Sequence, residues 1–162
     1  MAITKSESAS LRRKLYKYIV EIRNAVKEVR KNGKKFDIHD YPAIVVGCEY
    51  DIIEECGRSN KAHKRFKERI PCSEPLNVRV LKALKKIRSD VKIPGIFKDE
   101  ASGETRFLGT CAEDDAATKV LNRIDNTRQG NPLLQHLKFT EAKRPRTGSR
   151  KPYCKTCKQL FG

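Results

Sequence analysis

The chain lacks any long apolar stretch. None of its hydrophobic runs approaches the ~20 residues of a membrane-spanning helix, and only 38% of its 162 residues are hydrophobic. The N-terminal residues, Met-Ala-Ile-Thr-Lys-Ser-Glu, also lack the apolar core of a secretory signal. We therefore expect a soluble protein as given, although a translocating segment could have been removed from a longer parent.

Cysteines are few for this length. A chain of 162 residues buries roughly two-thirds of its unfolded surface, so disulfide bonds are not needed to hold the fold. An even number of cysteines permits a disulfide framework, but two of the six form a Cys-x-x-Cys motif, which favours a metal site over a redox dithiol or incidental thiols. Cys48, Cys56 and Cys72 have no motif around them and are expected to be buried as small hydrophobic residues.

Acidic residues are also few compared with basic ones. Lys and Arg number 36 against 20 Asp and Glu, which gives a net charge of +16 and a pI near 9.8. Such an excess favours a polyanionic partner bound through its phosphates. An anionic membrane surface is the competing interpretation.

Two amphipathic helices are predicted in the first 90 residues. Ser8 and Ser10 can cap a helix whose apolar residues recur every three or four positions until Asn32-Gly33, and we expect its apolar stripe to pack on the domain. Pro75 begins a second helix with an apolar stripe and a basic face. The apolar positions are Leu11, Leu15, Ile19, Ile22, Val26 and Val29 in the first helix and Leu76, Val80, Leu81, Leu84 and Ile87 in the second.

The segments between these helices are less distinctive. Residues 34–42 read as a loop with His39 in a structural or surface role, and residues 43–48 form either a strand or a buried helical turn. Residues 51–70 are polar and basic and end at Pro71, which indicates a helix with a solvated basic face or, alternatively, one that faces nucleic acid.

The C-terminal half alternates strands and helices. Residues 91–97 and 105–108 predict a hairpin around the turn at 99–103. Thr110 can cap the following helix, which ends between Asn126 and Pro132. Residues 133–140 predict a strand, residues 143–151 a basic loop, and Pro152 a short final helix.

Two short motifs carry metal-binding chemistry. Cys111-Ala112-Glu113 precedes a Cys154-x-x-Cys157 pair by some forty residues, and both lie at the start of predicted helices. Three cysteine ligands with an open fourth position are typical of catalytic zinc, whereas structural zinc has four protein ligands. Glu113 would then lie beside the metal without binding it, in the position of a general acid and base.

Cys111-Ala112-Glu113 with Cys154-x-x-Cys157 resembles the cytidine-deaminase-like zinc deaminases, in particular the toxin-type branches with Cys-Ala-Glu. The resemblance covers roughly the C-terminal half and implies an α/β (α+β mixed) fold with a three-layer core and a mixed sheet. Residues 75–162 would form the deaminase core and residues 1–74 a mainly helical extension, packed together as one domain. Unlike most of the family, this chain has Tyr153 between the proline and the first cysteine of the pair.

The resemblance implies hydrolytic deamination of cytosine to uracil, and the positive charge favours nucleic acid, with DNA ahead of RNA, as the substrate. It also implies a toxin or effector domain with a cognate immunity protein, acting in the cytosol or nucleus of a target cell, where thiols stay reduced. The candidate strand-contacting cations precede the second motif, and the alternatives for them are a flexible solvated loop or a nuclear-localisation-like run: Lys143, Arg144, Arg146, Arg150 and Lys151. Tyr153 is a further candidate contact. Phe107 and Tyr153 flank the two motifs and could stack on a base.

Two other functions remain open from the sequence. A closed structural zinc site with a fourth ligand such as His136 would make the chain a nucleic-acid-binding protein without activity. An adenine deaminase or a deaminase of free nucleosides has the same zinc motif but a different substrate pocket.

Overall fold

The computed structural model describes residues 2–33, 41–59, 75–93, 95–98, 102–103 and 105–162. They form an α+β fold, the class that the sequence predicts. The helices are α1 (Ala9–Lys31), α2 (Val78–Ile87), α3 (Ala112–Thr127) and α4 (Lys155–Phe161), with a 3-10 turn, η2, at Leu134–His136. The strands are β1 (Val45–Tyr50), β2 (Ile53–Arg58), β3 (Gly95–Lys98), β4 (Thr105–Leu108), β5 (Lys138–Phe139), β6 (Ala142–Lys143) and β7 (Arg150–Lys151).

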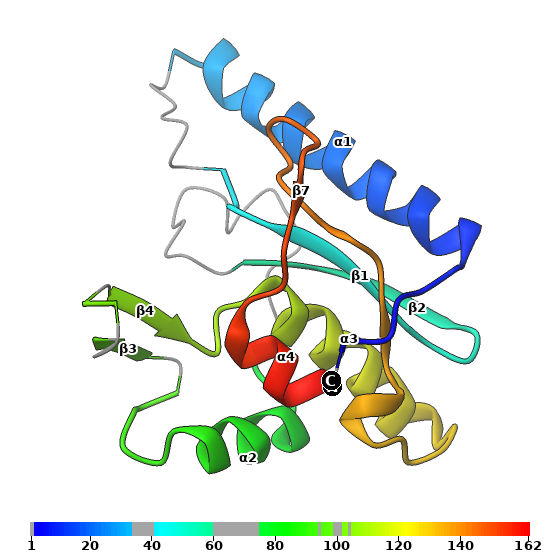
Figure 1. Ribbon diagram of the computed structural model, residues 1–162. Helices are drawn as coiled ribbons and strands as arrows, with labels where there is room; N and C mark the ends of the chain where they lie inside the picture. Colours follow the sequence, from blue (N-terminus) through cyan, green and yellow to red (C-terminus); the bar gives the residue numbers. More distant parts are fainter. Residues whose placement is uncertain (1, 34–40, 60–74, 94, 99–101, 104) are drawn as a thin grey trace.

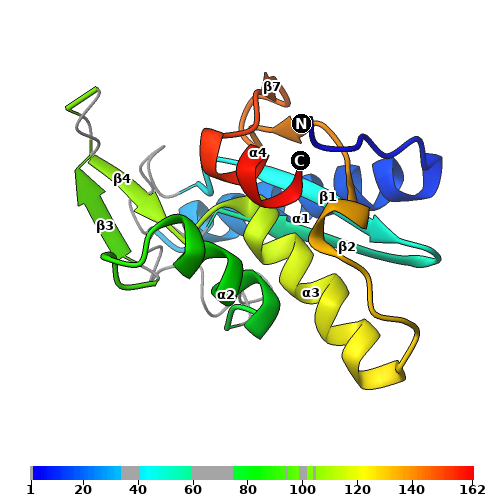
Figure 2. The same ribbon diagram turned by 60° about the horizontal axis from the view of Figure 1, so that its bottom comes forward.

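The main sheet has the strand order β2-β1-β6-β7, and β5 also pairs with β1. Its named strands pair antiparallel. The parallel pairing expected of a mixed sheet occurs in an isolated bridge between Lys5 and Phe139. Strands β3 and β4 form a separate two-stranded sheet that projects from the main one (Figure 2).

Helices cover both faces of the main sheet and give three layers. Helix α1 lies on one face, and α2, α3 and α4 lie on the other (Figure 1). Alternation along β1 explains this division, because successive side chains point to opposite faces. Val45 belongs to the apolar cluster under α1, whereas Val46 and Cys48 belong to the larger cluster around α3.

Helix α1 begins where the sequence predicts. The Ser8 hydroxyl accepts a hydrogen bond from the Leu11 backbone N–H at 3.1 Å, which is the usual role of an N-cap serine. The six predicted apolar residues and Tyr18 are all buried. The Ser8 and Ser10 hydroxyls also donate to the Glu54 carboxylate, which fixes the helix start against β2.

A very close contact sets the position of α3. A Cβ atom on Gly57 of β2 would lie 2.2 Å from the Ala116 backbone nitrogen and 2.4 Å from the Ala112 carbonyl oxygen. No side chain fits there, so glycine in the strand and alanines in the helix let the two backbones touch. Since Cys111 immediately precedes α3, this contact also places one candidate metal ligand.

Side chains occupy the outer edge of β2. The Glu54 carbonyl accepts from Lys14 at 3.3 Å and from Arg123 at 3.5 Å, and the Cys56 carbonyl accepts from Lys119 at 2.8 Å. The Arg58 backbone N–H donates to the Asp115 carboxylate at 3.0 Å. These contacts satisfy backbone groups that an edge strand otherwise leaves unpaired.

Several predicted elements are corrected by the structure. Residues 53–58 form strand β2 and not part of a basic helix. Of the two alternatives left open for residues 43–48, the structure shows the strand, since β1 begins at Val45. The basic segment 143–151 is a hairpin of two short strands and not a featureless loop. His39, Cys72 and the basic residues from 60 to 70 lie outside the described residues.

The division of the chain at residue 74 stays a prediction. Strands β1 and β2 precede it and pair, through β1, with β5 and β6, which follow it. No helix in the described part of the chain combines the length and apolar character needed to cross a membrane.

Candidate metal centre

Two helix N-termini meet at the predicted site. Cys111 is the N-cap residue of α3, and Cys154 is the N-cap residue of α4. Cys154 also caps α4 with its own side chain, because its Sγ accepts a hydrogen bond from the Cys157 backbone N–H at 3.3 Å. The predicted convergence of helix starts is therefore present, with Cys111 in the cap position that the sequence assigned to Thr110.

The three predicted cysteine ligands lie together. The Cys111 and Cys154 Sγ atoms are 3.5 Å apart, and the Sγ atoms of Cys111, Cys154 and Cys157 all lie within 4.8 Å of one another. Two sulfurs on one tetrahedral zinc ion are separated by about 3.8 Å, given a Zn–S bond of about 2.3 Å. The spacing of the sulfurs thus fits a single metal ion, and thiolates are soft ligands that suit zinc.

The sulfur cluster favours a thiolate even without metal. Hydrogen bonds from the thiols of Cys111 and then Cys157, with further bonds from backbone N–H groups, hold the pKa of the Cys154 thiol well below its ordinary value. The pKa values of the Cys111 and Cys157 thiols are raised, chiefly by their hydrogen bonds within the cysteine cluster and then by removal from water. A preformed anion is what a cation site needs.

Glu113 lies against this cluster. Its side chain is almost fully buried, with 4% exposed, and its Oε2 lies 3.5 Å from the Cys157 Sγ, which donates to it. Burial raises the pKa of the Glu113 carboxyl to about 7, and the nearby Cys154 sulfur adds to the effect. Such a carboxyl can both take up and release a proton near neutral pH.

The described residues offer no histidine as a fourth ligand. His136 is exposed, and its Nδ1 accepts a hydrogen bond from the Leu133 backbone N–H at 3.2 Å. It does not belong to the group of possible metal ligands, which within the described ranges contains three cysteines. Cys48 and Cys56 are free thiols outside that group.

The predicted nucleic-acid contacts lie on the hairpin that leads into Cys154. Arg144, Arg146, Arg150 and Lys151 are exposed and Lys143 is half-buried. Arg150 forms an ion pair with Glu141 at 2.7 Å. The fold therefore places these cations next to the cysteine cluster in the chain and mostly at the surface.

Tyr153 has a different environment from these cations. It is half-buried and packs against the main core cluster, and its hydroxyl donates to the Thr140 carbonyl at 2.6 Å. Burial raises the pKa of Tyr153 to about 12, and the charge of Glu113 contributes. The ring thus lies close to the site, but its hydroxyl is already engaged by the backbone. The Phe107 side chain lies outside the described residues.

One buried acid at the site was missed from the sequence. Asp114 is 1% exposed, and its two carboxylate oxygens have no hydrogen-bond partner among the described residues. Burial, followed by the charge of Glu113, raises its pKa well above the ordinary value. The sequence signal for this acid was the run Glu113-Asp114-Asp115 in the first turn of α3. Asp115, in contrast to Asp114, forms an ion pair with Lys119 at 3.5 Å and accepts a hydrogen bond from the Arg58 backbone N–H.

Comparison with known proteins adds no relative. No protein-family model, no curated protein and no solved structure matches this chain.

Proposed function

We propose that this protein is a zinc-dependent deaminase that converts cytosine to uracil in nucleic acid. The observation that carries the proposal is the buried Glu113 carboxyl in contact with a cluster of three cysteines. Three protein ligands and an adjacent carboxylate that need not bind the metal are the parts of a zinc deaminase site. The motif resemblance and the three-layer α+β fold support the same assignment.

In this proposal Cys111, Cys154 and Cys157 hold the zinc ion. When bound, zinc acts as a Lewis acid that makes a water molecule acidic near neutral pH. Two of the cysteines stand at helix N-cap positions, and of these Cys154 caps α4 with its sulfur, so the positive helix ends help to stabilise the thiolates. The cluster is not fully enclosed, because Cys111 and Cys154 are only partly buried.

Glu113 moves the protons of the reaction. It takes a proton from the attacking water, gives it to the ring nitrogen N3 of cytosine, and later delivers a proton to the departing amine. Cytosine and water thereby become uracil and ammonia. A pKa of about 7 in the metal-free protein suits a group that must gain and lose a proton within one cycle.

The net charge supports a polymeric substrate. A neutral nucleoside gains little from a charge of +16, whereas a polynucleotide is held through its phosphates. The exposed cations of the β6-β7 hairpin stand three to ten residues before Cys154 in the chain. DNA is favoured over RNA, in a toxin or effector domain that an immunity protein neutralises in the producing cell.

The decisive experiment compares the zinc-loaded protein with its Glu113→Ala variant. Single- and double-stranded DNA and RNA oligonucleotides are incubated with each protein and then sequenced. We expect C-to-U changes from the parent and a loss of at least about a hundredfold in the variant, the usual scale for a general acid and base. Zinc content and oligonucleotide binding of the variant should stay at the parent level.

A structural zinc on a nucleic-acid-binding protein is the second candidate. It would be favoured if stoichiometric zinc were bound but no base changed in any of the four substrates. Product formed from free cytidine or from adenine-containing oligonucleotides, but not from cytosine in a polymer, would instead redirect the assignment of substrate.

A further inference from the structure

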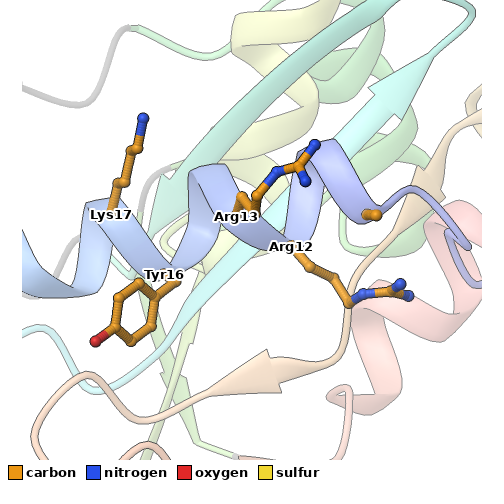
Figure 3. Close-up of a pocket in the computed structure, with 5 residues that line it drawn as sticks. Arg12, Arg13, Tyr16 and Lys17 are labelled. Carbon is orange, nitrogen blue, oxygen red and sulfur yellow. The ribbon is translucent and has the colours of Figure 1, made fainter.

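The outer face of α1 carries an exposed aromatic residue among cations. Tyr16 is 66% exposed and is the aromatic member of the exposed large hydrophobic side chains in the described part of the chain. Together with Ala9, three basic residues and Tyr16 line an open hollow on the helix surface: Arg12, Arg13 and Lys17 (Figure 3).

Packing does not account for Tyr16. The apolar stripe of α1 is buried against the sheet, and it includes Tyr18 but not Tyr16. Figure 3 shows Arg12 and Tyr16 extending from one side of the helix and Lys17 from the other. A base can stack on such a ring while its neighbouring phosphates reach the cations, which is how single strands bind without sequence preference.

This face adjoins the hairpin that leads to the metal centre. Arg23 of α1 donates to the Pro145 carbonyl at 2.8 Å, so the tip of the β6-β7 hairpin touches the helix. The hairpin carries exposed cations and continues through Tyr153 into Cys154. Basic residues on α1 and on the hairpin thus lie on two touching elements, one of which ends at the candidate site (Figure 1).

We propose that the outer face of α1 binds single-stranded nucleic acid, with Tyr16 stacking on a base and with Arg12, Arg13 and Lys17 contacting phosphates. Binding by α1 does not depend on the proposed function. The identification of the bound strand as the substrate of the deaminase does rest on it. A membrane surface fits the face less well, because a membrane-bound helix needs a stripe of exposed large apolar residues, and the apolar stripe of α1 is buried in the core, leaving Tyr16 exposed among cations.

A tryptophan reporter tests the stacking directly. The chain has no tryptophan, so a Tyr16→Trp variant carries a single fluorophore of that kind. We expect oligo(dT) to quench its emission by stacking, while heparin, a polyanion without bases, leaves it largely unquenched. Equal responses to oligo(dT) and heparin, or a blue shift with phosphatidylserine vesicles and no quenching by oligo(dT), would overturn the proposal.

Affinity measurements test the contribution of each group. Tyr16→Ala should bind a labelled oligo(dT) about tenfold more weakly, and Tyr16→Phe should bind like the parent, because stacking needs the ring and not the hydroxyl. The double variant Arg12→Gln/Arg13→Gln should lower the slope of log K against log salt by about 1.4, as expected for two lost phosphate contacts.

The matched control removes the same charge from another face. Lys85→Gln/Lys86→Gln changes two exposed lysines on α2. An equal loss of affinity and slope in this control would show that net charge alone matters and would refute the assignment to α1.

Binding and catalysis can fail separately in these experiments. Oligo(dT) contains no cytosine, so its affinity is measured without turnover and also in the Glu113→Ala background. Quenching of the tryptophan emission in the Tyr16→Trp variant without any base change in a cytosine substrate would reject the deaminase and keep the α1 surface. If polymers were deaminated, but Tyr16→Ala kept the activity and affinity of the parent, the deaminase would stand and the α1 surface would be rejected.

Discussion

Cys154 combines two roles in one side chain. Its sulfur caps α4 by accepting the Cys157 backbone N–H, and the same atom lies 3.5 Å from the Cys111 sulfur. A thiolate is a better acceptor for that N–H than a thiol, so capping and metal binding favour the same charge state. The two roles can be separated by substitution, because serine also caps helices well.

We predict that Cys154→Ser abolishes stoichiometric zinc binding while α4 and the fold remain. The hydroxyl keeps the cap but is a poor zinc ligand. Zinc measured by metal analysis after dialysis should fall far below one ion per chain, with the circular dichroism spectrum unchanged. The control is Cys56→Ala, which lies outside the cluster. If this control lost zinc equally, the site would be assigned to the wrong cysteines.

At the residue scale the sequence predicted which three cysteines lie together but not their surroundings. Cys154 and Cys157 are three apart and meet through local helix geometry, whereas Cys111 reaches them only through the packing of α3 on the sheet. The two motifs predict that Cys111 lies close to Cys154 and Cys157, and the structure confirms this proximity. The burial of Asp114 and the hydrogen bond of Tyr153 depend on neighbours distant in sequence, so the acidic run at the start of α3 points to Asp114 without showing that it is buried.

The start of α1 is tied to strand β2 by a small polar network. Glu54 accepts hydrogen bonds from the Ser8 hydroxyl at 2.7 Å and from the Ser10 hydroxyl at 2.8 Å. Burial raises the pKa of Glu54, but these hydrogen bonds outweigh it, and the net pKa lies below the ordinary value of 4.5. The network therefore stabilises the fold while Glu54 is charged, and its contribution is lost as the pH falls through the lowered pKa.

We predict that Ser8→Ala lowers the free energy of unfolding by about 1 kcal/mol or more at pH 7, because it removes the N-cap and one Glu54 contact. Ser10→Ala removes a Glu54 contact and keeps the cap. Urea unfolding at pH 7 and pH 3 should show the Ser10→Ala deficit shrinking in acid while much of the Ser8→Ala deficit persists. A Ser10→Ala deficit that grows in acid would contradict the assigned role of Glu54.

Strand β2 and helix α3 are held at backbone contact by Gly57. We predict that Gly57→Ala costs about 3 kcal/mol of stability, or prevents folding, because the new Cβ meets helix backbone that cannot turn aside. It should also weaken zinc binding, since α3 carries Cys111. Gly47→Ala is the comparison, because its Cβ meets the movable side chains of Leu11 and Thr140 at 2.9 Å. Thermal melts with and without zinc measure the stability of both variants. A larger loss of stability in Gly47→Ala than in Gly57→Ala would contradict the prediction.

At the element scale the helices were predictable and the edge strand was not. The apolar spacing of α1 and its serine cap are local signals, and the structure confirms both. Strand β2 carries Glu54, Glu55 and Arg58, which resemble a helical polar face in the sequence. Their polar groups are used at the edge of the sheet, where β2 makes hydrogen bonds with α1 and α3. The preceding turn also lacks glycine, and Asp51 adopts its positive φ of 54°.

The whole chain carries a net charge of +16. In the proposed reaction, raising salt from low to physiological concentration should increase the Michaelis constant for an oligonucleotide severalfold, because cations compete for the phosphates. The Michaelis constant for free cytidine, if it is turned over at all, should not change. Rates at several salt concentrations test this, and a salt-independent constant for the oligonucleotide would remove the charge argument.

At this scale the sequence predicted the class of the fold and the order of α2, β3, β4, α3 and α4, but not the 3-10 turn at Leu134–His136 or the β6-β7 hairpin. It did not predict which strands form the sheet beneath α3. The hairpin that enters α3, β3-β4, forms its own small sheet, and the strands under the helix are β1 and β2. Strand pairing across long sequence distances depends on tertiary packing, whereas apolar periodicity reports only local geometry.

The side chains along β2 also oppose one route of self-association, the addition of a strand from another copy. A strand from another chain finds the outer carbonyls of Glu54 and Cys56 occupied by Lys14, Lys119 and Arg123. Strand addition and cross-β stacking at this edge would first have to break those contacts. If the proposed polynucleotide substrate gathers many copies along one strand, these contacts would oppose their association through this edge.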